Sequence, residues 1–487
     1  MSALTTCSAT ELARRIRRRE CTAVEVLEAH LAHIRRWNDA INAVVTLDAE
    51  QARARAKAAD HALAEGRVWG PLHGVPVTVK DQFATAGLRT TYGLPHYADV
   101  VPDTDAPLVA RLRRAGAVLL GKTNLPTAAY DWQCRNPTFG RANNPWDRSR
   151  TPGGSSGGTA AALAAGFSPL GLGADVGGSI RIPSHFCGVA GLRPTEGALP
   201  LDGITPPDRP RTVRHIVVPG PMARTVEDLQ TAWAVLRGAP ATTTPPPHPA
   251  PSDLRIAVTP ELGGVPVDTD TQRVLREAVN ALADAGCVVE RREPPIDVDE
   301  ALDTWGRIQG FELSAGMPGP LRYPPGKQLL WHGYVRSQFG FLAGPLARGA
   351  QLRPRGYFRA LNRKDQLGRS VDAFLTDWDL WITPVASIPA FEHCPTGTDL
   401  SIDGVSVPYA LPFAAYNCAT AVLGHPILTL PAGRSRDGLP IGLQVHARRG
   451  RDAALLASGR TLSNVLGRDA TAPSLGDGNS PSDERQR

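Results

Sequence analysis

An alternation of short β-branched runs with helical segments, beginning at Gly74, limits this 487-residue chain to few fold classes. It predicts a strand over residues 75–79, a helix near residues 106–115 and a second strand over residues 117–120. Strands that alternate with helices form parallel or mixed sheets with crossover helices. We therefore expect an α/β fold in which a central mixed β-sheet is flanked by helices.

The N-terminal segment is expected to be helical. Capping boxes from Ser8 to Glu11 and from Thr22 to Glu25 predict two helix starts, because hydroxyl and carboxylate together satisfy the first free amides of a helix. A run rich in Ala and Arg over residues 49–64 predicts another helix.

The α/β pattern resumes in the second half of the chain. Strands are predicted over residues 254–258 and 379–385, with a helix near residues 271–285 between them. Residues 238–253 are rich in Pro and predict a surface connection that continues neither a helix nor a central strand. The tail over residues 471–487 is expected to be disordered.

Charge and composition exclude several classes of partner. The net charge is +6, and the arginine clusters near residues 14–19, 111–114 and 448–451 lack interleaved aromatic residues, so no nucleic-acid partner is expected. Two uncharged stretches, residues 151–174 and 404–433, are interrupted by Pro and Gly, which argues against membrane spans.

The seven cysteines are odd in number, widely spaced and without a CxxC pair. This pattern disfavours both a disulfide framework and a zinc site, and no metal is expected. The N-terminus lacks a basic region followed by an apolar segment, so we expect a cytoplasmic protein.

Two glycine-flanked serine loops suggest chemistry at a hydroxyl group. Residues 153–158 read Gly-Gly-Ser-Ser-Gly-Gly, and residues 177–181 read Gly-Gly-Ser-Ile-Arg, so that Ser179 follows Ser155 by twenty-four positions. Neither loop has the pattern of a P-loop or of a dinucleotide fingerprint. A predicted helix near residues 158–166 and a predicted strand near 169–174 place both serines at element ends, where α/β enzymes keep their sites.

These loops, with Lys80 in the run Val-Thr-Val-Lys-Asp, resemble the amidase signature family of serine hydrolases. Further stretches look like landmarks of the same family, namely residues 74–81, 121–125, 143–147, 220–225 and 438–444. The resemblance covers about 460 residues, so it implies one catalytic domain over residues 1–470 rather than two domains.

The resemblance implies a role for three side chains. Ser179 would be the acylated nucleophile, Ser155 a bridging serine that follows a cis peptide bond, and Lys80 the base. A serine hydroxyl is a poor nucleophile until a neighbour takes its proton, and a lysine accepts that proton only when it is neutral. Burial or a nearby cation must therefore lower the pKa of Lys80. The resemblance implies no metal or organic cofactor.

The backbone amides of Val176, Gly177, Gly178 and Ser179 would form the oxyanion hole, as the resemblance implies. Three side chains are expected to support the two loops through hydrogen bonds rather than to contact substrate, namely Ser156, Asp175 and Arg181.

A Ser-His-Asp triad is disfavoured because no Gly-x-Ser-x-Gly motif with an appropriately ordered acid and His is evident around the serines. His73, His185 and His425 are the candidate members, and at least His185 and His425 lie in apolar contexts that predict core positions. Cys187 is expected to be a buried core residue rather than a thiol nucleophile.

The sequence therefore predicts an amidase that hydrolyses a small-molecule carboxamide to a carboxylic acid and ammonia or an amine. An alternative is the glutaminase subunit of a tRNA-dependent amidotransferase, which would share the three residues but require partner subunits. Residues 130–136 look more like those of stand-alone amidases. A non-catalytic binding protein is a third alternative. A homodimer is among the oligomeric states that the sequence allows.

Aromatic residues gather between residues 301 and 350. They would either line an aryl or long-chain acyl pocket or pack in the core, and the sequence leaves both open. They are Trp305, Tyr323, Trp331, Tyr334, Phe339 and Phe341.

Overall fold

The computed structural model describes residues 3–239, 246–317, 333, 335–467 and 475. Its centre is a mixed sheet of eleven strands in the order β1-β3-β2-β6-β8-β7-β14-β15-β11-β9-β10. The strands of this sheet are β1 (Val44–Leu47), β2 (Pro76–Lys80), β3 (Val118–Thr123), β6 (Leu170–Asp175), β7 (Ala190–Arg193), β8 (Val218–Ala223), β9 (Arg255–Val258), β10 (Val288–Arg291), β11 (Leu380–Pro384), β14 (Ile427–Arg434) and β15 (Pro440–His446). The fold is a single α/β domain, and the α/β class is the one that the alternation of elements predicted.

Both parallel and antiparallel pairs occur in this sheet. β2 lies between β3 and β6 and is parallel to both, with Val79 opposite Lys122 on one side and Leu172 on the other. β6 then pairs antiparallel with β8, and β14 pairs antiparallel with both β7 and β15. β2 and β6, which carry the predicted site residues at their C-terminal ends, are therefore direct neighbours.

Helices surround this sheet, and two short hairpins lie outside it. The α-helices are α1 (Ala3–Thr6), α2 (Ala9–Arg17), α3 (Ala23–Ile41), α4 (Ala49–Ala64), α5 (Pro107–Arg114), α6 (Gly157–Ala164), α7 (Arg181–Cys187), α8 (Val226–Arg237), α9 (Thr269–Asp284), α10 (Val298–Ala315), α13 (Val335–Phe339), α14 (Ala343–Ala350), α15 (Pro354–Phe374), α16 (Leu411–Ala421) and α17 (Asp452–Leu466). The 3-10 helices are η1 (Pro95–Tyr97), η2 (Thr127–Ala129), η3 (Pro251–Asp253) and η5 (Gly340–Leu342). The hairpins pair β4 (Arg135–Asn136) with β5 (Gly140–Arg141) and β12 (Leu400–Ile402) with β13 (Val405–Val407).

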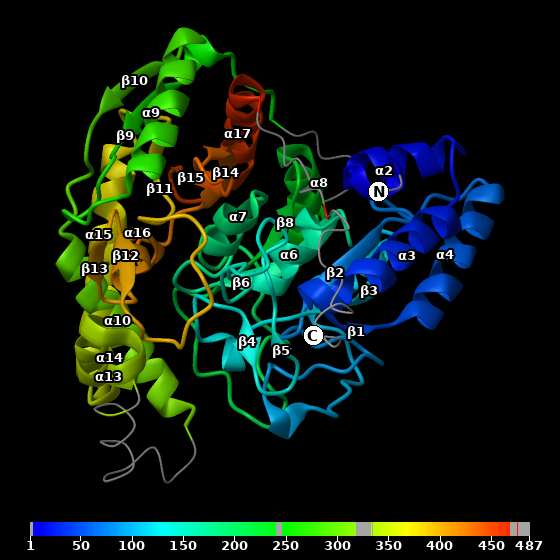
Figure 1. Cartoon of the computed structure of the whole chain (residues 1–487), viewed down its shortest axis with the longest axis horizontal. Coiled ribbons are helices and arrows are strands. Elements are labelled where there is room, and N and C mark those ends of the chain that lie inside the picture. The colour runs from blue at the N-terminus through cyan, green and yellow to red at the C-terminus, as the bar shows by residue number, and fades with distance from the viewer. Residues whose placement is uncertain (1–2, 240–245, 318–332, 334, 468–474, 476–487) are drawn as a thin grey trace, which may run out of the picture.

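Figure 1 shows α2, α3 and α4 beside β2 and β3 at one end of the molecule, and α9, α10 and α15 at the other. Helices α6 and α7 lie between these two ends. The apolar core has two large parts. One surrounds the strands, and the other is built around α10 and α16, where Trp305 and Phe413 are buried. The loops that lead into α6 and α7 therefore lie between the two parts of the core.

The local signals of the N-terminal helices are mostly confirmed. Thr22 accepts a hydrogen bond from the amide of Glu25, whose carboxylate accepts one from the amide of Thr22, so this capping box forms completely. The first box forms only in part. Ser8 caps the amide of Glu11, but the Glu11 carboxylate binds the guanidinium groups of Arg14 and Arg15 instead of reaching back.

The predicted elements correspond to β2, α5, β3, α6, β6, β9, α9 and β11, and the helix predicted over residues 49–64 is α4. The two uncharged stretches form buried elements that include α6, β6, α16 and β14. Among the residues that the structure describes, no helix has the length and apolar character needed to cross a bilayer. Of the proline-rich connection, residues 240–245 lie outside the described residues, as does the predicted tail except for residue 475.

Candidate active site

The amine of Lys80 occupies the end of a buried central strand. β2 is buried at every position, and the Lys80 side chain is completely shielded from solvent. Its Nζ donates hydrogen bonds to Ser155 Oγ at 2.6 Å and to Ser156 Oγ at 3.1 Å. Burial lowers the pKa of Lys80 to about 7 from its ordinary 10.5, against the opposing charge of Asp175. A neutral amine within hydrogen-bond distance of a serine hydroxyl can act as a base.

The loop before α6 holds these two serines against the lysine. The peptide bond between Gly154 and Ser155 is cis, as the family resemblance implied. Glycine is required by close contacts. A Cβ at Gly154 would lie 2.3 Å from the carbonyl oxygen of Gln133, and one at Gly158 would lie 2.4 Å from the amide of Asn124. The loop therefore packs directly against the backbone of the segments that contain Gln133 and Asn124.

Ser179 lies in the turn between β6 and α7, next to the first loop. The amide of Ser156 donates to the carbonyl oxygen of Ser179 at 3.0 Å, so the two serine loops are in direct contact. Ser179 is half-buried, whereas Ser155 is 2% exposed. The structure therefore brings Lys80, Ser155, Ser156 and Ser179 together at the adjacent ends of β2 and β6, with only Ser179 open to an incoming molecule.

Asp175 and Arg181 form a buried ion pair that shapes the second loop. The carboxylate accepts hydrogen bonds from the amides of Gly178 at 2.9 Å and Ile180 at 3.0 Å, and from the Arg181 guanidinium at 3.0 Å. Burial would raise the pKa of Asp175, but the charges of Arg181 and Arg193 hold it well below its ordinary value. Both side chains face inward, as expected of supporting residues.

Arg181 also ties the loop to the C-terminal half of the chain. Its guanidinium donates to Thr420 Oγ1 and to Gln444 Oε1, both at 2.8 Å, and to the carbonyl oxygen of Asn417 at 3.0 Å. These partners belong to α16 and β15. The position of the second loop is therefore fixed by elements more than two hundred residues away in sequence.

The four amides expected to form an oxyanion hole differ in their surroundings. The amide of Gly178 already donates to Asp175. The amides of Val176, Gly177 and Ser179 have no hydrogen-bond acceptor among the residues that the structure describes. A positive φ of 103° at Gly178 turns the chain at this point, and a side chain there would meet Ile182.

Two tryptophans hold the peptide groups of this turn. The indole N–H of Trp305 donates to the carbonyl oxygen of Val176 at 3.1 Å, and that of Trp132 donates to the carbonyl oxygen of Gly177 at 2.8 Å. In a trans peptide the N–H points opposite to its carbonyl. Fixing the carbonyl of Val176 therefore fixes the direction of the Gly177 amide. In the sequence, Trp305 stands out only as one member of an aromatic cluster, and Trp132 carries no signal of this role.

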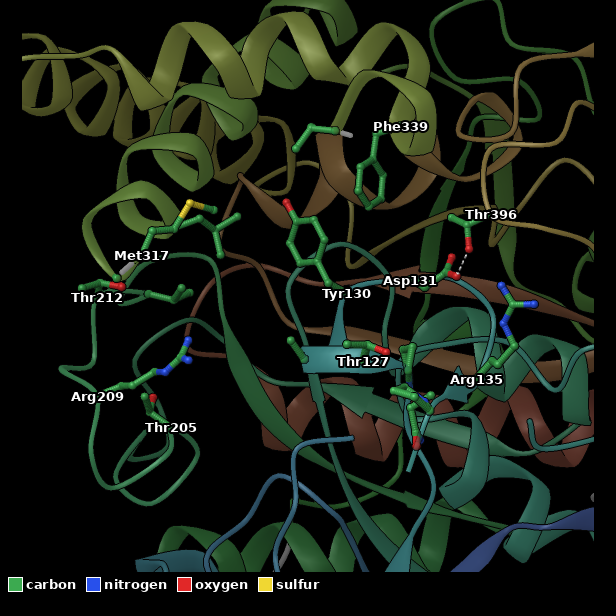
Figure 2. A pocket seen from close by; sticks show the side chains of 18 of the residues that line it. Thr127, Tyr130, Asp131, Arg135, Thr205, Arg209, Thr212, Met317, Phe339 and Thr396 are labelled. Carbon is green, nitrogen blue, oxygen red and sulfur yellow. Dashed lines mark hydrogen bonds between the residues drawn. The ribbon is translucent and has the colours of Figure 1, made fainter. Parts of the chain in front are cut away.

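A small cavity of about 50 Å³ lies in front of Ser179, lined also by Trp132, Gly177 and Trp305. It shares Tyr130, Asp131 and Phe339 with a second pocket of about 740 Å³. Figure 2 shows Tyr130 and Phe339 facing this larger pocket between Met317 on one side and Arg135 on the other. Of the aromatic residues noted in the sequence, Trp305 and Phe339 thus line the site, Phe341 is exposed, and Tyr323, Trp331 and Tyr334 lie outside the described residues.

The histidines form core contacts, as expected. Both ring nitrogens of His185 bond to the backbone, Nδ1 accepting from Gly442 and Nε2 lying 3.1 Å from the Ile388 oxygen, and burial lowers its pKa to about 4. His73 and His425 are buried too. Burial raises the pKa of the Cys187 thiol well above its ordinary range. Within the described ranges no cluster of three His, Cys, Asp or Glu side chains could hold a metal ion.

Comparison with known proteins identifies the family of the chain. A family model described as Amidase matches residues 25–456. The chain is 33% identical to one subunit of the glutamyl-tRNA(Gln) amidotransferase of Moorella thermoacetica, covering 96% of this chain and 98% of that protein. It is 31% identical to an acylamidase of Rhodococcus erythropolis, with 94% of each chain covered. A solved structure of 6-aminohexanoate cyclic dimer hydrolase with substrate superposes with a TM-score of 0.78 at 28% identity, covering 97% of this chain and 99% of that one. The chain belongs to the amidase signature family and is an amidase.

Proposed function

We propose that the chain hydrolyses a carboxamide C–N bond through an acyl-enzyme on Ser179, with Ser155 relaying protons to and from Lys80. The observation that carries the proposal is the buried Lys80 amine, 2.6 Å from Ser155 Oγ, beside a loop whose backbone touches that of Ser179. No histidine takes part. A small-molecule amide is the substrate.

In the first half-reaction, Ser179 Oγ attacks the amide carbonyl while its proton passes to Ser155 and the Ser155 proton passes to Lys80. The negative charge that develops on the carbonyl oxygen is stabilised by the amides of Val176, Gly177 and Ser179. Gly178 was expected to donate to the same oxygen. We assign its amide instead to holding Asp175, because the two are already hydrogen-bonded at 2.9 Å.

The tetrahedral intermediate then collapses as the C–N bond breaks. The proton held by Lys80 returns through Ser155 to the leaving nitrogen, so that ammonia or an amine departs neutral. In the second half-reaction, water attacks the ester of Ser179, and its proton follows the same path to Lys80. Breakage of the ester bond releases the carboxylic acid and returns the proton to Ser179.

Ser156, Asp175 and Arg181 support this arrangement without touching the reacting atoms. Ser156 Oγ accepts from Lys80 Nζ and lies 3.3 Å from the carbonyl oxygen of Ala174. It therefore orients the amine towards Ser155. The Asp175–Arg181 pair orients the loop that carries Ser179.

The test is labelling of the purified protein by a fluorophosphonate, together with hydrolysis of a small neutral amide. Ser179→Ala should abolish both, whereas Ser149→Ala, which alters an exposed serine, should leave both unchanged. Labelling that persists at full extent in Ser179→Ala would refute the nucleophile assignment.

The glutaminase alternative is supported by the 33% identity to the amidotransferase chain of Moorella thermoacetica over nearly the whole length. It predicts ammonia release from glutamine that depends on added partner subunits. Hydrolysis of simple amides by the isolated chain, with no stimulation of glutamine hydrolysis by partners, would favour the stand-alone amidase.

A further inference from the structure

The larger pocket has the position of a substrate subsite. Tyr130, Asp131 and Phe339 line both this pocket and the small cavity at Ser179. A molecule whose carbonyl occupies the small cavity can therefore extend one of its substituents past these three side chains into the larger pocket. A volume of about 740 Å³ falls in the range of pockets that enclose whole small-molecule ligands.

The wall of this pocket is mainly apolar on one side. Val213, Leu313, Met317, Val335 and Phe339 contribute aliphatic and aromatic surface from the loop before β8, from the end of α10 and from α13. Val335 and Phe339 are nearly buried, at 6% and 8% exposure. Binding to such a surface is favoured when the ligand buries an apolar group, and a small polar group adds nothing to the binding free energy.

The charged groups of the pocket disfavour a cation. Asp131 contributes the carboxylate of the described lining, and it already accepts hydrogen bonds from the hydroxyls of Thr396 and Tyr409 and from the amide of Trp132. Arg135 and Arg209 lie at the exposed rim, on opposite sides in Figure 2. An ammonium group in the pocket would meet two cations and a carboxylate whose oxygens already have donors.

The hydroxyl of Tyr130 is the polar group that lacks a partner. Its oxygen is buried and forms no hydrogen bond with any residue that the structure describes. The ring packs edge-on against Phe339 at 5.1 Å between centroids, which fixes its direction. In the view of Figure 2 the hydroxyl lies between Met317 and Phe339, within the wall of the pocket rather than exposed to its interior. A buried polar atom without a partner is unfavourable until a ligand supplies one.

We propose that this pocket binds a bulky, apolar and uncharged or anionic substituent of the scissile amide, and that Tyr130 donates a hydrogen bond to an acceptor atom on that substituent. The inference rests on the proposed hydrolysis at Ser179 and adds a substrate class to it. Glutamine, with its ammonium group, is accordingly a poor substrate.

The experiment measures kcat/KM for amides of increasing length in two arms. One arm varies the acyl group from acetamide through hexanamide to 4-phenylbutanamide. The other keeps an acetyl group and lengthens the amine, up to N-(4-phenylbutyl)acetamide. In the arm whose substituent enters the pocket, kcat/KM should rise about fourfold per buried methylene, while the other arm stays flat. A flat response in both arms would overturn the proposal.

Variants separate the pocket from the chemistry. Phe339→Ala should lower the ratio of kcat/KM for the phenyl-bearing amide of the responding arm to kcat/KM for acetamide by about tenfold, and fluorophosphonate labelling reports whether Ser179 remains reactive in the variant. Phe341→Ala is the matched control, since Phe341 is 41% exposed and outside the pocket lining. An equal loss on all substrates would assign Phe339 a purely structural role and refute the subsite. Absence of fluorophosphonate labelling in the wild-type protein would instead refute the proposed function.

Two further measurements test the polar part. Tyr130→Phe keeps the ring and should lower kcat/KM by about three- to tenfold for a substrate with an ether oxygen in its chain, but not for its all-carbon analogue. Equal effects on the two substrates would refute the hydrogen bond. Among hexanamides that end in methyl, carboxylate or ammonium, the ammonium form should react slowest. Preference for the ammonium form would refute the charge argument.

Discussion

The protonation state of Lys80 offers the sharpest test of the proposed chemistry. At pH 7, an amine with the ordinary pKa of 10.5 is neutral in about one molecule in 3,000, whereas one with a pKa of about 7 is neutral in about half. Burial therefore increases the amount of available base by about three orders of magnitude. We expect kcat/KM to rise with pH and to level off above an inflection near 7.

The assay is a pH profile of kcat/KM for a neutral amide, whose own ionisation does not interfere. Lys80→Met keeps an unbranched chain but removes the amine, and it should lower kcat by about 10²- to 10⁴-fold and abolish the inflection. An inflection above pH 9 would show that the lysine is not desolvated in solution. Near-normal activity of a folded Lys80→Met protein would refute its role as base.

Folding stability gives an independent reading of the same pKa. The folded state binds the Lys80 proton more weakly than the unfolded state, so between about pH 7 and 10.5 the unfolded chain holds more protons at this site. The free energy of unfolding must therefore rise with pH across that window. The upper limit is about 5 kcal/mol, since each unit of pKa shift corresponds to about 1.4 kcal/mol. Lys80→Met should lack this rise and be more stable than wild type below pH 7, as measured by urea unfolding.

Three further predictions concern the surroundings of the site. Asp175→Asn leaves the buried Arg181 without its counter-charge and should lower the free energy of unfolding by about 3–5 kcal/mol in urea titrations; a change below 1 kcal/mol would contradict the buried-pair argument. Trp305→Phe keeps a ring but loses the bond to Val176, so kcat should fall by about tenfold with little change in KM; a pure KM effect would place Trp305 in substrate binding instead. Thr22→Ala, far from the site, should lower the free energy of unfolding by about 1 kcal/mol, as measured by thermal unfolding, and leave kcat unchanged. A drop in kcat would show that this helix cap and the site are coupled.

The sequence predicted strands β2, β3, β6, β9 and β11 and the serine loops, because these features are encoded locally. Strand β2 reads as a β-branched run that ends in Lys80, and the glycines around Ser155 and Ser179 mark turns where a side chain would clash. Strands β1, β7, β8, β10, β14 and β15 of the main sheet had no predicted counterpart. Most of their pairings join partners far apart in the chain, such as Val44 opposite Thr123, which a local pattern does not contain. The pairing of β14 with β15 is the exception, since these consecutive strands form a hairpin.

The roles of Trp132 and Trp305 could not be predicted for the same reason. They come from positions 132 and 305, yet their indole N–H groups bind the carbonyls of successive residues in one turn. Tryptophan side chains in a sequence usually indicate core packing. Here each indole packs in the cluster around α10 and α16 and also donates a hydrogen bond to the turn. A hydrogen bond between residues 129 positions apart leaves no local signal in a single sequence.

This division between local and distant determinants separates the chemistry of the site from its selectivity. The proposed reacting groups lie at Lys80 and within residues 153–181, although residues elsewhere, such as Trp305, help to hold them in place. The pocket beyond Tyr130 is assembled instead from the loop before β8, from α10, from α13 and from the region of Thr396. The wall residues outside the cavity at Ser179, such as Val213 and Met317, can therefore change without touching Lys80 or either serine. It follows that relatives with the same reacting groups can act on different amides, and that the substrate of this chain is to be sought through its pocket wall rather than through its serines.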